Sequence, residues 1–244
     1  MHKIHNRMIY RFDILTSTND EIARPDYAEG DIVFAESQSA GRGQRGHTWE
    51  SQQGENATFS MLFKPHFLAP DRQFLLSEMV ALGVTDTLSS YGIEAQIKWT
   101  NDIYVGDRKI AGILIEHKLT GANIDRTIAG VGLNINQRHF SEHLPNPTSM
   151  ALEANSTFDR HEVLERFSKN VMYRYEQLQS GKTEQIQADY HSLLYHRNAE
   201  HWYALPDGSR FRGTIMGVEP TGALLVKNEQ GEVRVFLFKE IEFC

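Results

Sequence analysis

A glycine-rich segment that carries cationic side chains is the part of this chain best suited to hold an anionic ligand. Residues 36–49 read ESQSAGRGQRGHTW and lie between two strand-like runs, at 31–36 and 57–63. Glycine allows the backbone to approach a ligand closely, and the guanidinium fork of arginine pairs well with carboxylate or phosphate. The segment is not a P-loop, because no Lys-Ser/Thr pair ends it and a strand follows. We expect an anion-binding loop; the alternative is a flexible surface loop.

A second cationic motif, KWTND, begins at Lys98, near the end of a strand predicted over 95–99. Lysine is a point charge on a flexible stem and can follow negative charge as it moves between oxygen atoms. The structural alternative is a strand-end lysine that extends its ammonium group to water. The motif therefore indicates either a catalytic cation or a surface lysine.

Two further strand-like runs carry glycine together with polar side chains. Residues 108–116, RKIAGILIE, contain two cations and one glycine, Gly112, of the kind that often marks a bulge or a close ligand approach. Residues 129–136, AGVGLNIN, place Gly130, Gly132 and Asn134 on the next run. We expect the small residues to leave room for a flat ligand on the sheet, with Asn134 at its polar edge.

The elements that must position these motifs follow from hydrophobic periodicity and turn residues. Strands are predicted at 9–12, 31–36, 57–63, 95–99, 103–105, 109–117 and 127–136, and helices after Ser17, at 72–90, at 159–178 (with Asp159 as N-cap) and at 183–195. Beyond residue 197, short strands at 202–205, 211–218, 223–226 and 233–238 alternate with turns, as in a small β-barrel. The sequence thus predicts an α+β fold with two domains, 1–196 and 197–244.

The composition excludes several classes of protein. The 244 residues carry a net charge of −7, which argues against non-specific nucleic-acid binding. No apolar run is long enough for a membrane span, and the N-terminus lacks the apolar core of a signal peptide. The single cysteine, Cys244, allows no internal disulfide. We expect a cytoplasmic protein with no protein-bound metal centre, because the scattered histidines lack metal-site spacing.

Taken together, the motifs match one family in order and spacing. Residues 17–19 (STN), the glycine-rich loop, KWTND, KIAGILIE and GVGLN make the chain resemble a biotin–protein ligase (biotin–[acetyl-CoA-carboxylase] ligase). Only 16 residues precede Ser17, so the resemblance is to a short form that lacks the N-terminal DNA-binding domain. It implies a class II synthetase-like catalytic domain with a mixed sheet and flanking helices, and a C-terminal SH3-like barrel. Two residues depart from the family pattern: Thr100 replaces a proline, and Gln44 replaces a third arginine.

The resemblance implies a two-step reaction. The biotin carboxylate attacks the α-phosphate of MgATP to give biotinyl-5′-AMP and pyrophosphate, and a lysine of a biotin carboxyl carrier domain then displaces AMP. Among the catalytic residues it implies, Lys98 bridges the biotin carboxylate and the phosphate, Arg42 holds the phosphate, and Asp102 orients the carrier amine. Lys109 is expected to hold the departing pyrophosphate. We expect residues 41–47 to close over the intermediate and exclude water.

The remaining ligand contacts are assigned on the same basis. Ser17, Thr18 and Gln38 are expected to contact the ureido ring of biotin. Trp49 and Asn134 are expected to contact adenosine, although Trp49 could instead be a core aromatic. Further contacts are expected from Asn19, Gly41, Gly43, Gln44, Arg45, Asn101, Gly112, Gly130 and Gly132. Two alternatives stay open, a lipoate or octanoate ligase and a non-catalytic module that binds biotinyl-adenylate. The identity of the carrier, and whether the chain is a monomer or a homodimer, also stay open.

Overall fold

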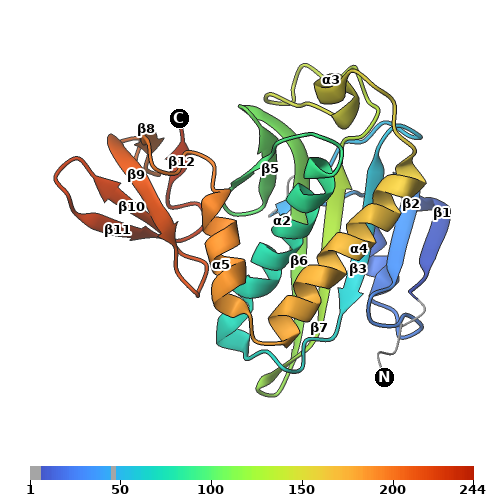
Figure 1. Cartoon of the computed structure of the whole chain (residues 1–244). Helices are drawn as coiled ribbons and strands as arrows, with labels where there is room; N and C mark the ends of the chain where they lie inside the picture. The colour runs from blue at the N-terminus through green and yellow to red at the C-terminus, as the bar shows by residue number, and fades with distance from the viewer. Residues whose placement is uncertain (1–6, 45–47) are drawn as a thin grey trace.

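A mixed seven-stranded sheet forms the centre of the molecule in the computed structural model, which describes residues 7–44 and 48–244 (Figure 1). Its order is β1-β2-β3-β7-β6-β5-β4. The strands are β1 (Ile9–Leu15), β2 (Ile32–Gln38), β3 (Ala57–Phe63), β4 (Gln96–Lys98), β5 (Asp102–Val105), β6 (Arg108–Thr120) and β7 (Asn123–Leu133). Only β1 and β2 pair in parallel; every other pair in this sheet is antiparallel. The predicted α+β class with a mixed sheet is confirmed.

One face of this sheet is covered by three helices (Figure 1): α2 (Phe74–Ser89), α4 (Arg160–Gln179) and α5 (Thr183–Ser192). Asp159 caps α4 as predicted, because its side chain accepts hydrogen bonds from the amides of His161 and Glu162. Gly83 lets α2 and α4 approach closely, since a Cβ there would lie 2.8 Å from the Cβ of Val171. The sheet and the three helices enclose the main apolar core.

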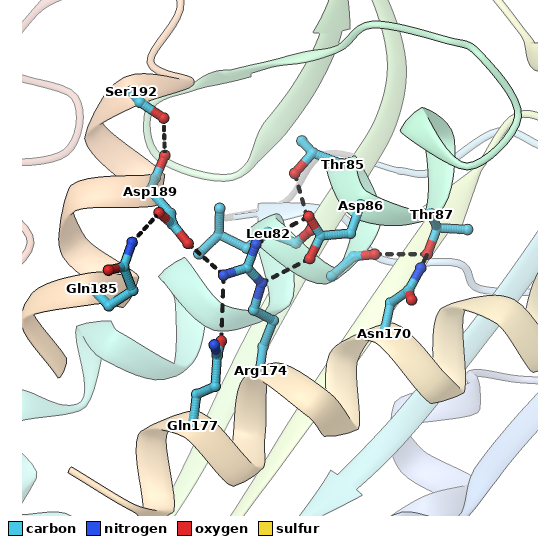
Figure 2. Close-up of polar contacts among 11 residues, drawn as sticks. Leu82, Thr85, Asp86, Thr87, Asn170, Arg174, Gln177, Gln185, Asp189 and Ser192 are labelled. Atoms are coloured by element: carbon cyan, nitrogen blue, oxygen red, sulfur yellow. Dashed lines mark hydrogen bonds and ion pairs between the residues drawn. The ribbon is translucent and has the colours of Figure 1, made fainter. Parts of the chain in front are cut away.

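A partly buried cluster of ion pairs ties the three helices together (Figure 2). The guanidinium of Arg174 on α4 donates to both carboxylate oxygens of Asp86 on α2, at 2.7 and 3.1 Å, and also to Asp189 on α5. Arginine suits this place because its fork can serve two carboxylates at once. The helices therefore form one rigid layer behind the sheet.

The opposite face of the sheet carries the short helix α1 (Thr18–Ile22). Alternation along the strands decides which side chains face it. Ile32, Phe34 and Met61 point into the main core, whereas Val33 and Leu62 join a second apolar cluster around Ile22 of α1. The polar residues of β3 share this second face, and the glycines of β7 lie beside them.

A second, five-stranded antiparallel sheet follows α5, as Figure 1 shows beside the main sheet. Its order is β11-β10-β9-β8-β12, from β8 (Glu200–Ala204), β9 (Arg210–Val218), β10 (Leu224–Asn228), β11 (Val233–Phe236) and β12 (Glu242–Phe243). The predicted C-terminal β strands are thus present, and β12 is an addition. Closure into a barrel and the division at residues 196 and 197 stay predictions.

Most element boundaries lie within a few residues of those predicted, and the β6–β7 hairpin differs most. Its strands pair as far as Thr120 and Asn123, around a turn at Gly121 with φ of 59°. The polar residues at this end, such as Lys118 and Asn123, are exposed to solvent. They do not interrupt the strands, because the strands pair through their backbones. The sequence also missed the one-turn helices η2 (Pro70–Arg72) and α3 (Met150–Ala154). None of the helices in the described part of the chain is long and apolar enough to cross a membrane.

Candidate active site

A cavity of about 290 Å³ opens on the α1 face of the main sheet. Most of the predicted site residues line it: Ser17, Thr18, Asn19, Gln38, Arg42, Gly43, Gln44, Trp49, Asn101, Asp102, Lys109, Gly112, Gly130 and Gly132. The other lining residues were not predicted from the sequence as site residues. They are Thr48, Thr58, Phe59, Trp99, Thr100, Ile113, Leu114, Val131 and Phe238. The main sheet supplies the floor, and Phe238 comes from the segment after β11.

One end of the cavity is built from hydroxyl and amide groups. The carboxamide oxygen of Gln38 accepts hydrogen bonds from the amide and the hydroxyl of Thr18, at 2.7 and 3.1 Å. Ser60 on β3 donates to the Thr18 hydroxyl at 2.7 Å. Ser17 is the N-cap of α1, yet its hydroxyl makes no capping hydrogen bond. This end can therefore pair with a small polar group of a ligand.

Ser60 itself was missed by the sequence analysis. It is fully buried and reaches both Thr18 and Asn19, so it holds the start of α1 against the sheet. The sequence does contain a pattern that indicates this position, because Thr58 and Ser60 are polar residues two apart in an otherwise apolar strand and therefore lie on the same face.

The two glycines of β7 allow side chains of the protein itself to approach the sheet closely. A Cβ on Gly130 would lie 2.4 Å from the Asn19 side-chain oxygen, and one on Gly132 would lie 2.1 Å from Trp49 Cε2. Side chains of Asn19 and Trp49 therefore lie close above these glycines, which both still line the cavity, and the expected room for a flat ligand stays a prediction. The indole of Trp49 gives the cavity a flat aromatic wall.

Trp49 is held by close packing rather than by hydrogen bonding. Gly112 on β6 lies beneath the same ring, with a Cβ position 3.1 Å from Trp49 Cζ3. The indole N–H is buried and has no hydrogen-bond partner among the described residues. Buried N–H groups are normally paired, so this donor is available to a ligand.

Replacing Gly132 by alanine is expected to displace Trp49 and to lower the free energy of unfolding by about 1–3 kcal/mol, the usual cost of overpacking. The reason is the 2.1 Å clash between the new methyl group and the indole. Urea unfolding together with tryptophan fluorescence would measure both effects. Gly112→Ala is the matched control, because its 3.1 Å contact is far milder; an equal effect in both variants would contradict this packing account.

Among the described residues two cations line the cavity, and both are paired with carboxylates. The ammonium of Lys109 lies 2.7 Å from Asp102 Oδ1 and 5.7 Å from the centre of the Trp49 ring. Arg42 Nη2 lies 2.7 Å from Asp20 and 3.5 Å from Glu116. Glu116 also accepts a hydrogen bond from Asn19 at 2.6 Å. The cationic end of the cavity is thus connected to α1 by a chain of polar contacts.

Lys98 is not among the residues that line the cavity. Its ammonium lies 4.7 Å from the centre of the Tyr104 ring and 3.3 Å from the Tyr104 hydroxyl. Burial lowers the pKa of this ammonium group. The physical reason is strand alternation: Trp99 takes the cavity side, so Lys98 points to the other. Of the two lysines, Lys109 therefore lines the cavity and Lys98 does not.

Two other predicted residues, Asn134 and Gly41, also lie away from the cavity lining. The amide of Asn134 donates to the Thr148 carbonyl at 2.9 Å, and the side chain is buried beside the sheet rather than at an edge of the cavity. Gly41 supports the loop, because its carbonyl accepts a hydrogen bond from the Trp49 amide at 3.2 Å. Arg45, and with it part of the predicted closing segment 41–47, lies outside the described residues.

The two departures from the family pattern lie next to each other. The hydroxyl of Thr100 donates to the carboxamide oxygen of Gln44 at 3.4 Å. The neighbouring Asn101 amide donates to the Ile113 carbonyl at 2.8 Å and so fixes the β4–β5 turn on β6. The side chain at position 100 thereby connects this turn to the glycine-rich segment.

Comparison with known proteins defines the class. Residues 10–134 match the Biotin/lipoate A/B protein ligase family, and the chain belongs to that family. It is 28% identical to the bifunctional ligase/repressor BirA of Bacillus subtilis, over 94% of this chain and 72% of that protein. It is 34% identical to the biotin–[acetyl-CoA-carboxylase] ligase of Paracoccus denitrificans over 49% of this chain and 51% of that protein.

Among solved structures, the fold is similar to the biotin protein ligase of Aquifex aeolicus in complex with biotin and ATP. The TM-score is 0.82 with 24% identity, over 97% of this chain and 98% of the other. The similarity spans both sheets of the present structure.

Proposed function

We propose that this chain is a biotin–protein ligase, which activates biotin with MgATP as biotinyl-5′-AMP and transfers it to a lysine of a biotin carboxyl carrier domain. Family membership and the names of the similar proteins support this function. The single observation that carries it is the cavity itself, which joins a hydroxyl and amide end to a cationic end over one flat indole. Biotin and the nucleotide need these two environments side by side.

The first step is a displacement at the α-phosphate. The ureido group of biotin lies at the Thr18 and Gln38 end, which places its carboxylate toward Lys109. A carboxylate oxygen attacks the α-phosphorus, and the bond to the β-phosphate oxygen breaks to release pyrophosphate. Negative charge builds on the phosphate oxygens, and Lys109 and Arg42 are placed to stabilise it. Magnesium enters as part of MgATP, and Asp102 is the one carboxylate among the described lining residues.

The second step transfers the acyl group to an amine. The neutral amine of the carrier lysine attacks the acyl carbon, and AMP leaves as the C–O bond of the mixed anhydride breaks. An ordinary lysine, with a pKa of about 10.4, is almost fully protonated at neutral pH. Asp102 is the acceptor we assign to that proton, and its contact with Lys109 at 2.7 Å supports this assignment. The same contact gives Asp102 a second task, which is to orient Lys109.

We expect the chain to catalyse biotin-dependent exchange of labelled pyrophosphate into ATP and to biotinylate a carrier domain when biotin and MgATP are supplied. Mass spectrometry of the carrier would detect the modified lysine. Lipoate and octanoate serve as competing substrates in the same assay. Incorporation of either acid in preference to biotin would show that the chain is a lipoate-type ligase. Pyrophosphate exchange without transfer to any carrier would show that the chain only forms the adenylate.

A further inference from the structure

Lys98 carries a half-buried ammonium group that the proposed chemistry does not use. We propose that Lys98 is a positioning residue, which docks the C-terminal sheet against the edge of the main sheet so that the C-terminal segment completes the cavity. The inference rests on the proposed function, because its kinetic test is adenylate formation. It assigns to this lysine a role away from the reacting atoms.

Three aromatic rings from three separate segments surround the ammonium. The Lys98 nitrogen lies 4.7 Å from the centre of the Tyr104 ring on β5, 5.2 Å from that of Phe243 on β12 and 5.9 Å from that of Tyr195 after α5. A cation above an aromatic face is attracted by the negative charge of that face, and the attraction is stronger when water is excluded. We call this group of Lys98 and the three rings the aromatic cage.

The cage members are themselves fixed to both sheets. The Tyr195 hydroxyl donates to Asp107 in the β5–β6 turn at 2.7 Å, and the Tyr195 amide donates to the Ile97 carbonyl at 2.9 Å. Phe243 pairs with Tyr203 of β8 in the second sheet. The aromatic cage therefore links the edge strand of the main sheet to the last strand of the C-terminal sheet.

The next residue makes the second connection, on the opposite side of the strand. The Trp99 indole donates to the Gly222 carbonyl in the β9–β10 turn at 2.9 Å, and its ring lies 6.4 Å from that of Phe238. Trp99 and Phe238 both line the cavity. Lys98 and Trp99 thus hold the C-terminal sheet at two points, and one of these points is a cavity wall. Release of the first point loosens the second.

Lys98→Met tests this role, because methionine keeps the apolar stem and removes the charge. We expect a rise in the apparent KM for ATP or biotin on the order of tenfold, the range of one desolvated cation–π contact, with kcat for pyrophosphate exchange changed less than threefold. Hydrogen–deuterium exchange of residues 236–244 should become faster. Lys98→Arg keeps the cation and should restore both readouts. The exposed Lys118→Met on β6 is the matched control.

The partner ring supplies the decisive comparison. Phe243→Ala should reproduce the KM effect. The Lys98→Met/Phe243→Ala double variant should have a KM no higher than that of the more impaired single variant. A hundredfold loss of kcat in Lys98→Met with normal kinetics in Phe243→Ala would overturn the proposal, as would unchanged hydrogen exchange over residues 236–244. Absence of exchange activity in the unaltered chain would instead count against the proposed function, and the hydrogen-exchange arm would still decide the role of Lys98.

Discussion

Replacing Lys109 by glutamine is expected to lower kcat for biotin-dependent pyrophosphate exchange by about 10²–10³-fold, the usual effect of removing a preorganised group that stabilises transition-state charge. Lys109 is the lysine that lines the cavity within the described part of the chain, and its ammonium is held 2.7 Å from Asp102. Glutamine retains much of the length and can still donate to that carboxylate. The fold should therefore persist while the charge is lost.

The comparison with Lys98 makes this test specific. Both lysines come from strands of the same sheet, Lys98 from β4 and Lys109 from β6, but of the two only Lys109 lines the cavity. We expect Lys109→Gln to act on kcat and Lys98→Met to act on KM. Asp102→Asn should give an intermediate loss in the first step, because Lys109 loses its fixed partner but keeps its charge. A Lys109→Gln variant with kcat within threefold of the parent chain would rule out the proposed role.

Replacing Glu78 by glutamine is expected to stabilise the protein at pH 8 by a few kcal/mol and to leave it nearly unchanged at pH 4.5. Glu78 lies on α2 with 0% of its surface exposed, and neither carboxylate oxygen has a hydrogen-bond partner in the described structure. Burial raises the pKa of this carboxyl to about 8, against a small opposing effect of Arg72. The Tyr190 hydroxyl on α5, also buried and unpaired, belongs to the same surroundings.

The direction of the pH dependence follows from proton binding. Unfolded, the carboxyl ionises near pH 4.5, whereas in the folded chain it keeps its proton until about pH 8. The folded state binds more protons between these values, so the contribution of Glu78 to stability is complete below pH 4.5 and is lost as the pH rises to 8. The full loss is on the order of 5 kcal/mol, because the pKa differs by about 3.5 units at 1.36 kcal/mol each.

Urea unfolding at pH 4.5, 6 and 8 would measure this difference between the parent chain and Glu78→Gln. All other titrating groups are common to the two proteins, so the difference isolates Glu78. Glu94→Gln is the matched control, because that side chain is exposed beyond the end of α2. A stability difference that does not grow with pH would show that Glu78 is not held protonated in the folded state.

Much of the fold was accessible from the sequence because its signals are local. The apolar face of residues 160–179, with Asp159 before it, predicted α4 and its cap, and the apolar run at 57–63 predicted β3. Turn residues predicted the short C-terminal strands. The two-residue strand β12 was missed because its pairing with β8 is non-local and leaves no periodic pattern in two residues.

The site was predicted in outline, since the motifs converge on one cavity, but the direction of individual side chains was not. Lys98 and Lys109 look alike in sequence, and only the alternation of Lys98 with Trp99 along the strand end separates them in space. Gly130 and Gly132 were expected to leave room above the sheet for a flat ligand. Sequence could not say whether a ligand or another part of the chain comes close, and here Asn19 and Trp49 do so.

The pairing of Arg42 with Asp20 and Glu116, and of Lys109 with Asp102, has a consequence for affinity. A phosphate-bearing molecule that enters must compete with these carboxylates for the two cations, so binding exchanges one anionic partner of each cation for another. Multivalent polyphosphates can compete in that exchange, whereas simple monovalent anions are poor competitors. Selectivity against the chloride and acetate of the surrounding solution is thus built in before any ring or sugar is recognised.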